Sequence, residues 1–209
     1  LYFNYLFGDK PNQVQRCRGI MNIDSLTSRF ILAPSEQKAS KFARIFTPAA
    51  VLFPIVERGN KLHLILTRRA AHLRHHSGQI AFPGGKTEDS DISSIATALR
   101  ETHEEIGIPA EQITVLGLLP SRPTISRYYV TPVVAIVDTD YRSEIDANEV
   151  DELFEVPLAF LLDADNHIIE KSWFQGKYRE VTFMPWGKYP IWGMTAAIIK
   201  DFSKHIRNN

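Results

Sequence analysis

Three glutamates stand at helical spacing near the middle of the chain: Glu101, Glu104 and Glu105. Residues three and four positions apart lie side by side on a helix, so Glu101 would meet both of the others. Like charges at this spacing repel each other, and carboxylates near the C-terminal end of a helix also oppose the helix dipole. The cluster is therefore unfavourable without a compensating positive charge, and two interpretations of it follow.

The first interpretation is a solvated acidic surface, which is the usual outcome for an arbitrary sequence. The second is a site for a hard divalent cation, Mg²⁺ or Mn²⁺, because such ions prefer carboxylate oxygens. The preceding residues favour the second, since Pro83, Gly84 and Gly85 end a predicted strand and leave the backbone open to close approach. Glycines alone are weak evidence. A strand end, a glycine loop and a helix with Arg100 before its glutamates form a far more specific combination.

A helix must carry the acidic cluster, and the sequence predicts one that is capped by Asp91 and runs to about Ile106. Gly107 is a good helix stop. The face expected to point inward is an apolar stripe at helical period, formed by Ile95, Leu99, Thr102 and Ile106.

The rest of the chain alternates between strand and helix patterns. Helices are predicted at 23–32 and 194–206, and a strand end running into a short helix or turn at 153–162. The predicted strands are 49–56, 61–67, 79–82, 113–119, 129–137 and a hairpin of 179–184 with 189–192. This alternation predicts one α/β sandwich with a mixed β-sheet.

The bulk composition restricts the class of protein. The 209 residues suffice for one domain with a substantial core, and 44% of them are hydrophobic, which argues against disorder. Lys and Arg together number 24, as do Asp and Glu, so the formal net charge is zero. A nucleic-acid partner is disfavoured, since such proteins usually carry a strong basic bias.

Two further features bear on location and extent. Cys17 is the only cysteine, so no disulfide can form within the chain, and a cytoplasmic protein is expected. No apolar stretch is long enough to span a bilayer, so no membrane association is expected. Residues 1–20 have a mixed composition without a clear period, and we expect them to be a non-native or disordered N-terminal extension.

The segment 85–108 resembles the signature box of the Nudix hydrolases, in which a loop–helix–loop holds metal on a glutamate-rich helix. The family pattern is Gly, five residues, Glu, seven residues, then Arg-Glu-apolar-x-Glu-Glu-x-Gly-apolar. Here 14 residues separate Gly85 from Arg100, one more than in that pattern. Asp91 stands where the family has its first Glu, and Thr102 fills the apolar position. The resemblance implies a Nudix-like α/β/α sandwich, with residues 21–209 as a single Nudix hydrolase domain.

A second motif lies just upstream of the box and resembles that of the coenzyme A diphosphatases of this superfamily. It comprises Leu66-Thr67-Arg68-Arg69-Ala70, Arg74, Gly78 and Phe82-Pro83-Gly84-Gly85. The one-residue longer box is also typical of that subgroup. The resemblance implies metal-dependent hydrolysis of the diphosphate link of coenzyme A or a derivative. The products would be 3′,5′-ADP and 4′-phosphopantetheine or its acylated form.

The same resemblance assigns roles to the box residues. Glu101 and Glu105 would be ligands of Mg²⁺ or Mn²⁺. Glu104 would be a third ligand or a contact to metal-bound water, and could equally serve as general base. Arg100 would orient carboxylates of the helix by ion pairing.

Residues outside the acidic helix complete the predicted site. Arg69 and Arg74 are expected to bind phosphates, since the guanidinium fork suits phosphate oxygens, and Gly84 and Gly85 to line the substrate site. A solvated basic loop is the alternative for the two arginines. The nearby histidines invite a zinc interpretation, but no cysteine partners accompany them, so surface or substrate-edge roles are favoured: His72, His75 and His76.

A general base and an aromatic contact are harder to place. Glu149, in a loop with Asp151 and Glu152, is the candidate base from outside the box, against a solvated acidic loop. Tyr128 and Tyr129 could stack on adenine, but aromatic residues in strands are more often core, and the same preference applies to Trp186 and Trp192.

Alternative functions remain within and beyond this enzyme class. The runner-up is a Nudix hydrolase of another nucleoside diphosphate derivative, such as NADH or ADP-ribose. A non-catalytic Nudix sensor would typically have lost box glutamates, and all three are present. The expected partner is a small-molecule substrate, and a homodimer stays open.

Overall fold

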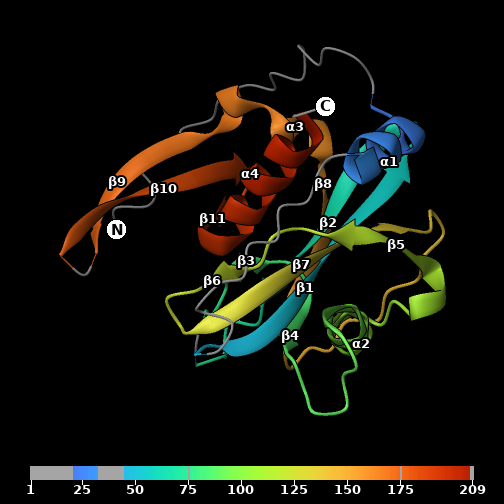
Figure 1. The fold of residues 1–209 in the computed structure, drawn as a ribbon, viewed down its shortest axis with the longest axis horizontal. Coiled ribbons are helices and arrows are strands. Elements are labelled where there is room, and N and C mark those ends of the chain that lie inside the picture. Colours follow the sequence, from blue (N-terminus) through green and yellow to red (C-terminus); the bar gives the residue numbers. More distant parts are fainter. Residues whose placement is uncertain (1–20, 33–44, 75, 175, 208–209) are drawn as a thin grey trace.

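The computed structural model describes residues 21–32, 45–74, 76–174 and 176–207, and Figure 1 shows their arrangement. An eight-stranded sheet has the order β3-β2-β1-β7-β5, with β4, β6 and β8 pairing off this path. Strands β1 and β7 are parallel, whereas β2, β4 and β5 pair antiparallel. The sheet is therefore mixed, and the expected α/β sandwich is confirmed.

The strands of this sheet are β1 (Thr47–Arg58), β2 (Lys61–Arg69), β3 (Ile80–Ala81), β4 (Gly84–Lys86), β5 (Ile113–Leu118), β6 (Arg122–Pro123), β7 (Tyr128–Val137) and β8 (Val150–Pro157). A second, three-stranded sheet contains β9 (Ile168–Phe174), β10 (Lys177–Trp186) and β11 (Tyr189–Trp192). The helices are α1 (Ile23–Leu32), α2 (Ser94–Ile106), α3 (Leu158–Leu162) and α4 (Gly193–Arg207), with 3₁₀ turns at Ala110–Gln112 and Ala164–Asn166.

Helices cover both faces of the large sheet, with α2 on one side and α1, α3 and α4 on the other (Figure 1). Side chains alternate between the faces of a strand, and β1 shows this directly. Phe53 and Ile55 join the core under α1 and α4, whereas Ala50 and Leu52 join the core under α2. The sheet therefore fixes where α2 lies.

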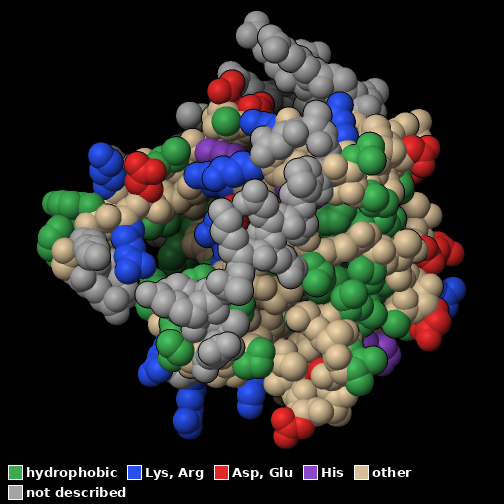
Figure 2. All heavy atoms as spheres, viewed as in Figure 1, with side chains coloured by type: hydrophobic (Ala, Val, Ile, Leu, Met, Phe, Trp, Pro, Cys, Tyr) green, Lys and Arg blue, Asp and Glu red, His purple; other side chains and the backbone are tan. Residues whose placement is uncertain are grey.

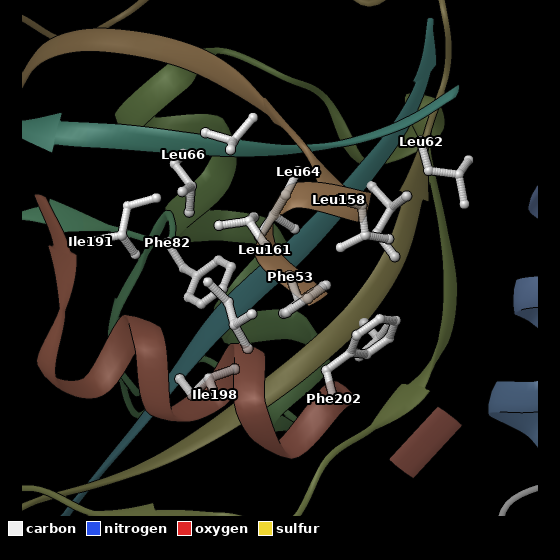
Figure 3. Close-up of a cluster of buried hydrophobic side chains, with 14 of the residues drawn as sticks. Phe53, Leu62, Leu64, Leu66, Phe82, Leu158, Leu161, Ile191, Ile198 and Phe202 are labelled. Atoms are coloured by element: carbon white, nitrogen blue, oxygen red, sulfur yellow. The ribbon is translucent and has the colours of Figure 1, made fainter. Parts of the chain in front are cut away.

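The larger core is aromatic and aliphatic, and Figure 3 shows part of it. Phe53 of β1 stacks on Phe202 of α4 with ring centroids 4.5 Å apart, and lies 5.1 Å from the ring of Phe82. Phe82 directly precedes the Pro83-Gly84 segment. Packing of this ring therefore ties the glycine segment to the core.

Helix α2 begins later than the sequence predicted. Ser93, rather than Asp91, is the N-cap, and its side chain accepts a hydrogen bond from the Ala96 N–H. Asp91 is not free to cap, because its carboxylate accepts from the Glu88 N–H and from Arg100. Gly107 ends the helix at φ 70°, as predicted.

The predicted stripe of α2 faces the core, with Thr102 and Ile106 buried, but the buried side of the helix extends beyond this stripe. Ile95 and Leu99 are only partly buried, and the buried residues are Thr97, Ala98, Thr102, Glu105 and Ile106. An apolar period therefore placed the helix correctly but missed that a glutamate lies on its buried side.

Three strands went unpredicted, and the shortest of them is β6. Gly84–Lys86, expected as a loop, forms β4 and pairs with Ala49–Val51 of β1. Strand β9, with its mixed polar and apolar residues, pairs with β10 and widens the predicted hairpin to three strands. The long hairpin of β9 and β10 extends away from α4 (Figure 1). Acidic and basic side chains are interspersed on the molecular face drawn in Figure 2.

Residues 1–20, predicted to be an extension, lie outside the described residues. Within the described part of the chain, no helix has the length and apolar character needed to cross a membrane.

Candidate active site

An open cleft of about 390 Å³ lies where β1, β4, β7 and α2 meet. Most of the predicted site residues line it. They are Arg69, Gly84, Gly85, Glu101, Glu105 and Glu149, together with Ala49, Val51, Lys86, Thr124, Tyr128 and Val130. The fold thus brings residues of the box, of the upstream motif and of a distant loop to one place.

Two glycines form one wall of this cleft, where β1 and the Glu101 side chain lie close to the backbone. A Cβ on Gly85 would lie 2.5 Å from the Glu101 carboxylate. A Cβ on Gly84, whose φ is 150°, would lie 2.6 Å from the Cα of Val51. Glycine at both positions therefore lets β4 fit between β1 and the acidic helix.

Glu105 is an unusual carboxylate because only 3% of its side chain is exposed. It accepts a 3.0 Å hydrogen bond from the Gly84 N–H, and the Arg69 guanidinium lies 3.6 Å away. Burial raises its pKa to about 8, with nearby negative charges of Glu149 and Glu101 adding to the effect, against the Gly84 N–H and Arg69. Because burial outweighs these favourable contacts, a bound cation would favour the ionised form of Glu105.

Glu101 lies beside it and is also partly desolvated. Burial raises the pKa of Glu101, while the hydrogen bond and charge of Arg100 oppose that rise. Glu101 and Glu105 both line the cleft. Glu101 lies next to Gly85, and Glu105 lies next to Gly84.

Arg100 forms ion pairs with three carboxylates near the cleft, those of Asp91, Glu101 and Glu104. Its guanidinium pairs with Asp91 through two bonds of 3.0 and 2.9 Å. It also donates to Glu101 at 3.0 Å and to Glu104 at 2.8 Å. This arginine holds the pKa of Asp91 well below its ordinary value. The ion pairing expected of Arg100 is present.

Glu149 reaches the cleft through a loop that docks on the end of α2. The N–H groups of Glu144 and Asp146 donate to the carbonyls of Ile106 and Glu105 at 2.9 and 3.0 Å. The Glu149 carbonyl accepts from the Ala70 N–H at 2.8 Å. These bonds satisfy helix-end carbonyls and hold the loop against the acidic helix.

Other predicted residues lie elsewhere. The Glu104 side chain is 56% exposed, pairs with Arg100 and does not line the cleft. Arg74 is exposed and is also outside the lining. His72 and His76 are exposed as well, and His75 lies outside the described residues.

Asp151 and Glu152, predicted to share a loop with Glu149, lie instead in strand β8. Asp151 is exposed, and Glu152 pairs with Lys188 and accepts a hydrogen bond from the Tyr189 hydroxyl. Neither lines the cleft, so of these three acids Glu149 is the one that the fold brings to the glutamates.

The preference for core positions was wrong for two aromatic residues. Tyr128 is 37% exposed and lines the cleft, and Trp192 is exposed to the same extent beside Phe183. Both occupy ends of strands, where the sheet is not covered. Tyr129 and Trp186 are partly buried, and Trp186 packs on the core.

Sequence reasoning missed Lys86 and Thr124 as residues of the cleft. Lys86 directly follows Gly85, so a basic residue next to the glycine pair was an available signal. Thr124 belongs to a turn before β7, and nothing in its local sequence marks it.

The donor set of the cleft fits a hard divalent cation, because Glu101, Glu105 and Glu149 offer only carboxylate oxygens. Within the described residues, no three His, Cys, Asp or Glu side chains are already gathered into a metal-binding group. The carboxylate oxygens therefore support a hard divalent cation, and the set of residues that bind it stays a prediction.

Comparison with known proteins agrees with this site. A family model described as the NUDIX domain matches residues 46–175. Proteins named Uncharacterized Nudix hydrolase NudL, from Escherichia coli (strain K12 / DH10B) and Cronobacter sakazakii (strain ATCC BAA-894), are each 40% identical over 187 residues. These alignments cover 89% of this chain and 95% of each relative.

A solved structure of a MutT/nudix family protein from Enterococcus faecalis shares the fold, with a TM-score of 0.51 at 19% identity. That match covers 90% of this chain and 70% of the other. The chain belongs to the Nudix family, and it is a Nudix-type hydrolase.

Proposed function

We propose that this hydrolase cleaves the diphosphate link of coenzyme A or a derivative, giving 3′,5′-ADP and 4′-phosphopantetheine. The observation that carries the proposal is the position of the upstream motif. Arg69 near its start and Gly84-Gly85 at its end line the same cleft as Glu101 and Glu105. A motif typical of coenzyme A diphosphatases thus contributes directly to the catalytic cleft.

In this proposal Glu101 and Glu105 hold Mg²⁺ or Mn²⁺, with Glu104 as a third ligand after turning away from Arg100. Bound there, the metal would neutralise diphosphate charge and lower the pKa of the attacking water. The raised pKa values of Glu101 and Glu105 support this, because a cation would compensate carboxylates that burial disfavours.

The substrate is held by the cationic and glycine-lined part of the cleft. Arg69 and Lys86 offer positive charge to the diphosphate, and the two glycines allow its oxygens to approach the backbone. Arg74, exposed outside the cleft, is assigned to a phosphate farther out, such as the 3′-phosphate of coenzyme A.

Glu149 is our candidate to accept the proton of the attacking water. It lines the cleft with Glu101 and Glu105, and its negative charge contributes to the raised pKa values of both. Glu104 is the alternative base. Arg100 is a positioning residue that holds Glu101 through an ion pair.

The test is a comparison of initial rates on coenzyme A, NADH and ADP-ribose, each with Mg²⁺ and with Mn²⁺. We expect coenzyme A to have the highest kcat/KM. Equal or faster turnover of ADP-ribose or NADH would overturn the proposal and favour the runner-up, a Nudix hydrolase of another nucleoside diphosphate derivative. Absence of turnover with every substrate would favour a non-catalytic sensor.

A further inference from the structure

The residues that line the cleft form two chemically different parts. The glutamates and Arg69 surround the segment where Gly84 pairs with Val51. Farther along, Ala49 pairs with Lys86 on one side and with Val130 on the other, and the next side chain on that face of β7 is Tyr128, opposite Thr47. Apart from Lys86 and Thr124, the side chains that line this part are apolar or aromatic. The charged part suits a diphosphate, and the apolar part suits a group attached to it.

Tyr128 is separated from the glycine segment by a defined length of strand. Val51 pairs with both Gly84 and Pro132, and Tyr128 lies four residues before Pro132 on β7. At about 3.3 Å per residue, the separation is roughly 13 Å. One nucleotide can bridge a span of this size from its diphosphate to its base.

The backbone of Tyr128 is fixed by a tight turn, residues 124–128. The Thr124 N–H donates to the Tyr128 carbonyl at 2.8 Å, and the Thr124 hydroxyl accepts from the Tyr128 N–H at 2.8 Å. Arg127 has φ 65°, a left-handed conformation that costs about 1–3 kcal/mol in a residue other than glycine. Its carbonyl accepts from Thr47 of β1 at 3.0 Å. The turn therefore presents Tyr128 from a preorganised position.

The Tyr128 ring is available for contact with a ligand. Its side chain is 37% exposed at the cleft, and among the described residues no other aromatic ring stacks on it. Ala49, Val51 and Val130 provide small apolar surfaces beside it. A flat ring of a ligand can contact both the Tyr128 ring and these apolar side chains, because stacking on an aromatic side chain needs a π-face rather than hydrogen-bond partners.

We infer that Tyr128 and this apolar floor form a nucleobase subsite, in which the planar base of the substrate stacks on the Tyr128 ring. The flexible, amide-rich pantetheine half of coenzyme A suits this part of the cleft less well, because Thr124 and Lys86 are the polar side chains that line it. The inference rests on the proposed function and assigns the nucleotide half of the substrate to one side of the glutamates.

The test uses the two products, because only one contains a base. Calorimetric titration of 3′,5′-ADP and of 4′-phosphopantetheine, each with Mg²⁺, would be run on the wild type, Tyr128→Leu and Tyr128→Phe. Tyr178→Leu is the matched control, because Tyr178 is an exposed tyrosine outside the cleft. Thermal melting of each variant checks that folding is intact.

We expect Tyr128→Leu to raise the Kd of 3′,5′-ADP about tenfold or more, while the Kd of 4′-phosphopantetheine changes less than about twofold. Tyr128→Phe, which keeps the ring, and Tyr178→Leu should both bind 3′,5′-ADP like the wild type. With coenzyme A as substrate, Tyr128→Leu should raise KM and leave kcat near the wild-type value.

An unchanged Kd for 3′,5′-ADP in Tyr128→Leu, or a change confined to 4′-phosphopantetheine, would overturn the subsite. Failure of the proposed function would look different. In that case the wild type would not hydrolyse coenzyme A, yet Tyr128-dependent binding of 3′,5′-ADP would still support the base subsite.

Discussion

The Arg100 guanidinium donates to the carboxylates of Asp91, Glu101 and Glu104, and also to the Lys86 carbonyl at 3.1 Å. Charge-assisted bonds of this kind are directional and strong. At the scale of single residues, Arg100 therefore couples the loop before α2 to a glutamate that lines the cleft. Asp91 does not line the cleft, and its contact with a residue that pairs with Glu101 is the ion pair with this arginine.

Replacing Asp91 by Asn should lower kcat about 10- to 100-fold, because Arg100 loses its two-bond anionic partner and Glu101 is held less firmly. Steady-state kinetics on the preferred substrate measures this. Asp91→Glu keeps the charge and should recover most of the rate. Asp89→Asn, an exposed acid in the same loop, is the control. Equal rates in Asp91→Asn and Asp89→Asn would contradict the positioning role.

Glu101→Gln should lower kcat by about two to three orders of magnitude while the fold stays intact, since a neutral amide replaces a predicted metal ligand. The rate would be measured beside a circular dichroism melt. Glu111→Gln, an exposed change outside the cleft, should be silent in both. Unchanged activity in Glu101→Gln would refute the assignment of the acidic cluster.

At the scale of elements, the C-terminal end of α2 and the loop that carries Glu149 depend on one another. A Cβ on Gly107 would lie 2.8 Å from the backbone N and O of Glu144. Gly107 thus serves two purposes: it adopts the left-handed helix-end conformation, and it leaves room for the loop that follows Tyr141.

Gly107→Ala should therefore reduce both stability and activity, because the displaced loop carries Glu149 away from the cleft. Gly187→Ala is a matched control, since Gly187 has φ 55° but a Cβ there would meet no atom within 4 Å. The control should lose about 1–2 kcal/mol of stability and keep full kcat. Melting temperature and kcat are compared for the two variants. Equal kcat values at similar loss of stability would argue against loop displacement.

In the molecule as a whole, α2 packs on one face of the large sheet, and α1, α3 and α4 pack on the other. The cleft lies where β1, β4, β7 and α2 meet. Burial of Glu105 in the α2 layer is unfavourable for its charged form, and its pKa is raised accordingly to about 8. Without a bound cation, the ionised form of Glu105 is therefore unfavourable at the cleft. Ligation by a cation should stabilise the molecule as a whole.

Adding Mg²⁺ or Mn²⁺ should raise the melting temperature, and EDTA should reverse the rise. At about 100 times the Kd, binding to the folded state alone stabilises by about 2.7 kcal/mol. For a domain of this size, that corresponds to roughly 5–10 °C. Glu105→Gln should abolish the metal-dependent rise. A rise of the same size in Glu105→Gln would show that the stabilising ion binds elsewhere.

Features that depend on local pattern were predictable from the order of the residues. The spacing of Glu101 and Glu105 placed both on one helix side, and both line the cleft. Gly107 ended that helix because only a residue tolerant of positive φ suits the position. The buried strands and the mixed sheet followed from runs of apolar residues, which must be covered wherever they occur.

Contacts between residues far apart in the sequence became visible in the folded chain. It paired Asp91 with Arg100 instead of the helix cap, turned Glu105 toward the buried side, and brought Glu149 and Tyr128 to the cleft. Local periodicity reports on neighbours in sequence, whereas these contacts depend on strand register and on the docking of loops. Side chains that are ordinary in their own segments become a site because the sheet fixes the distances between them.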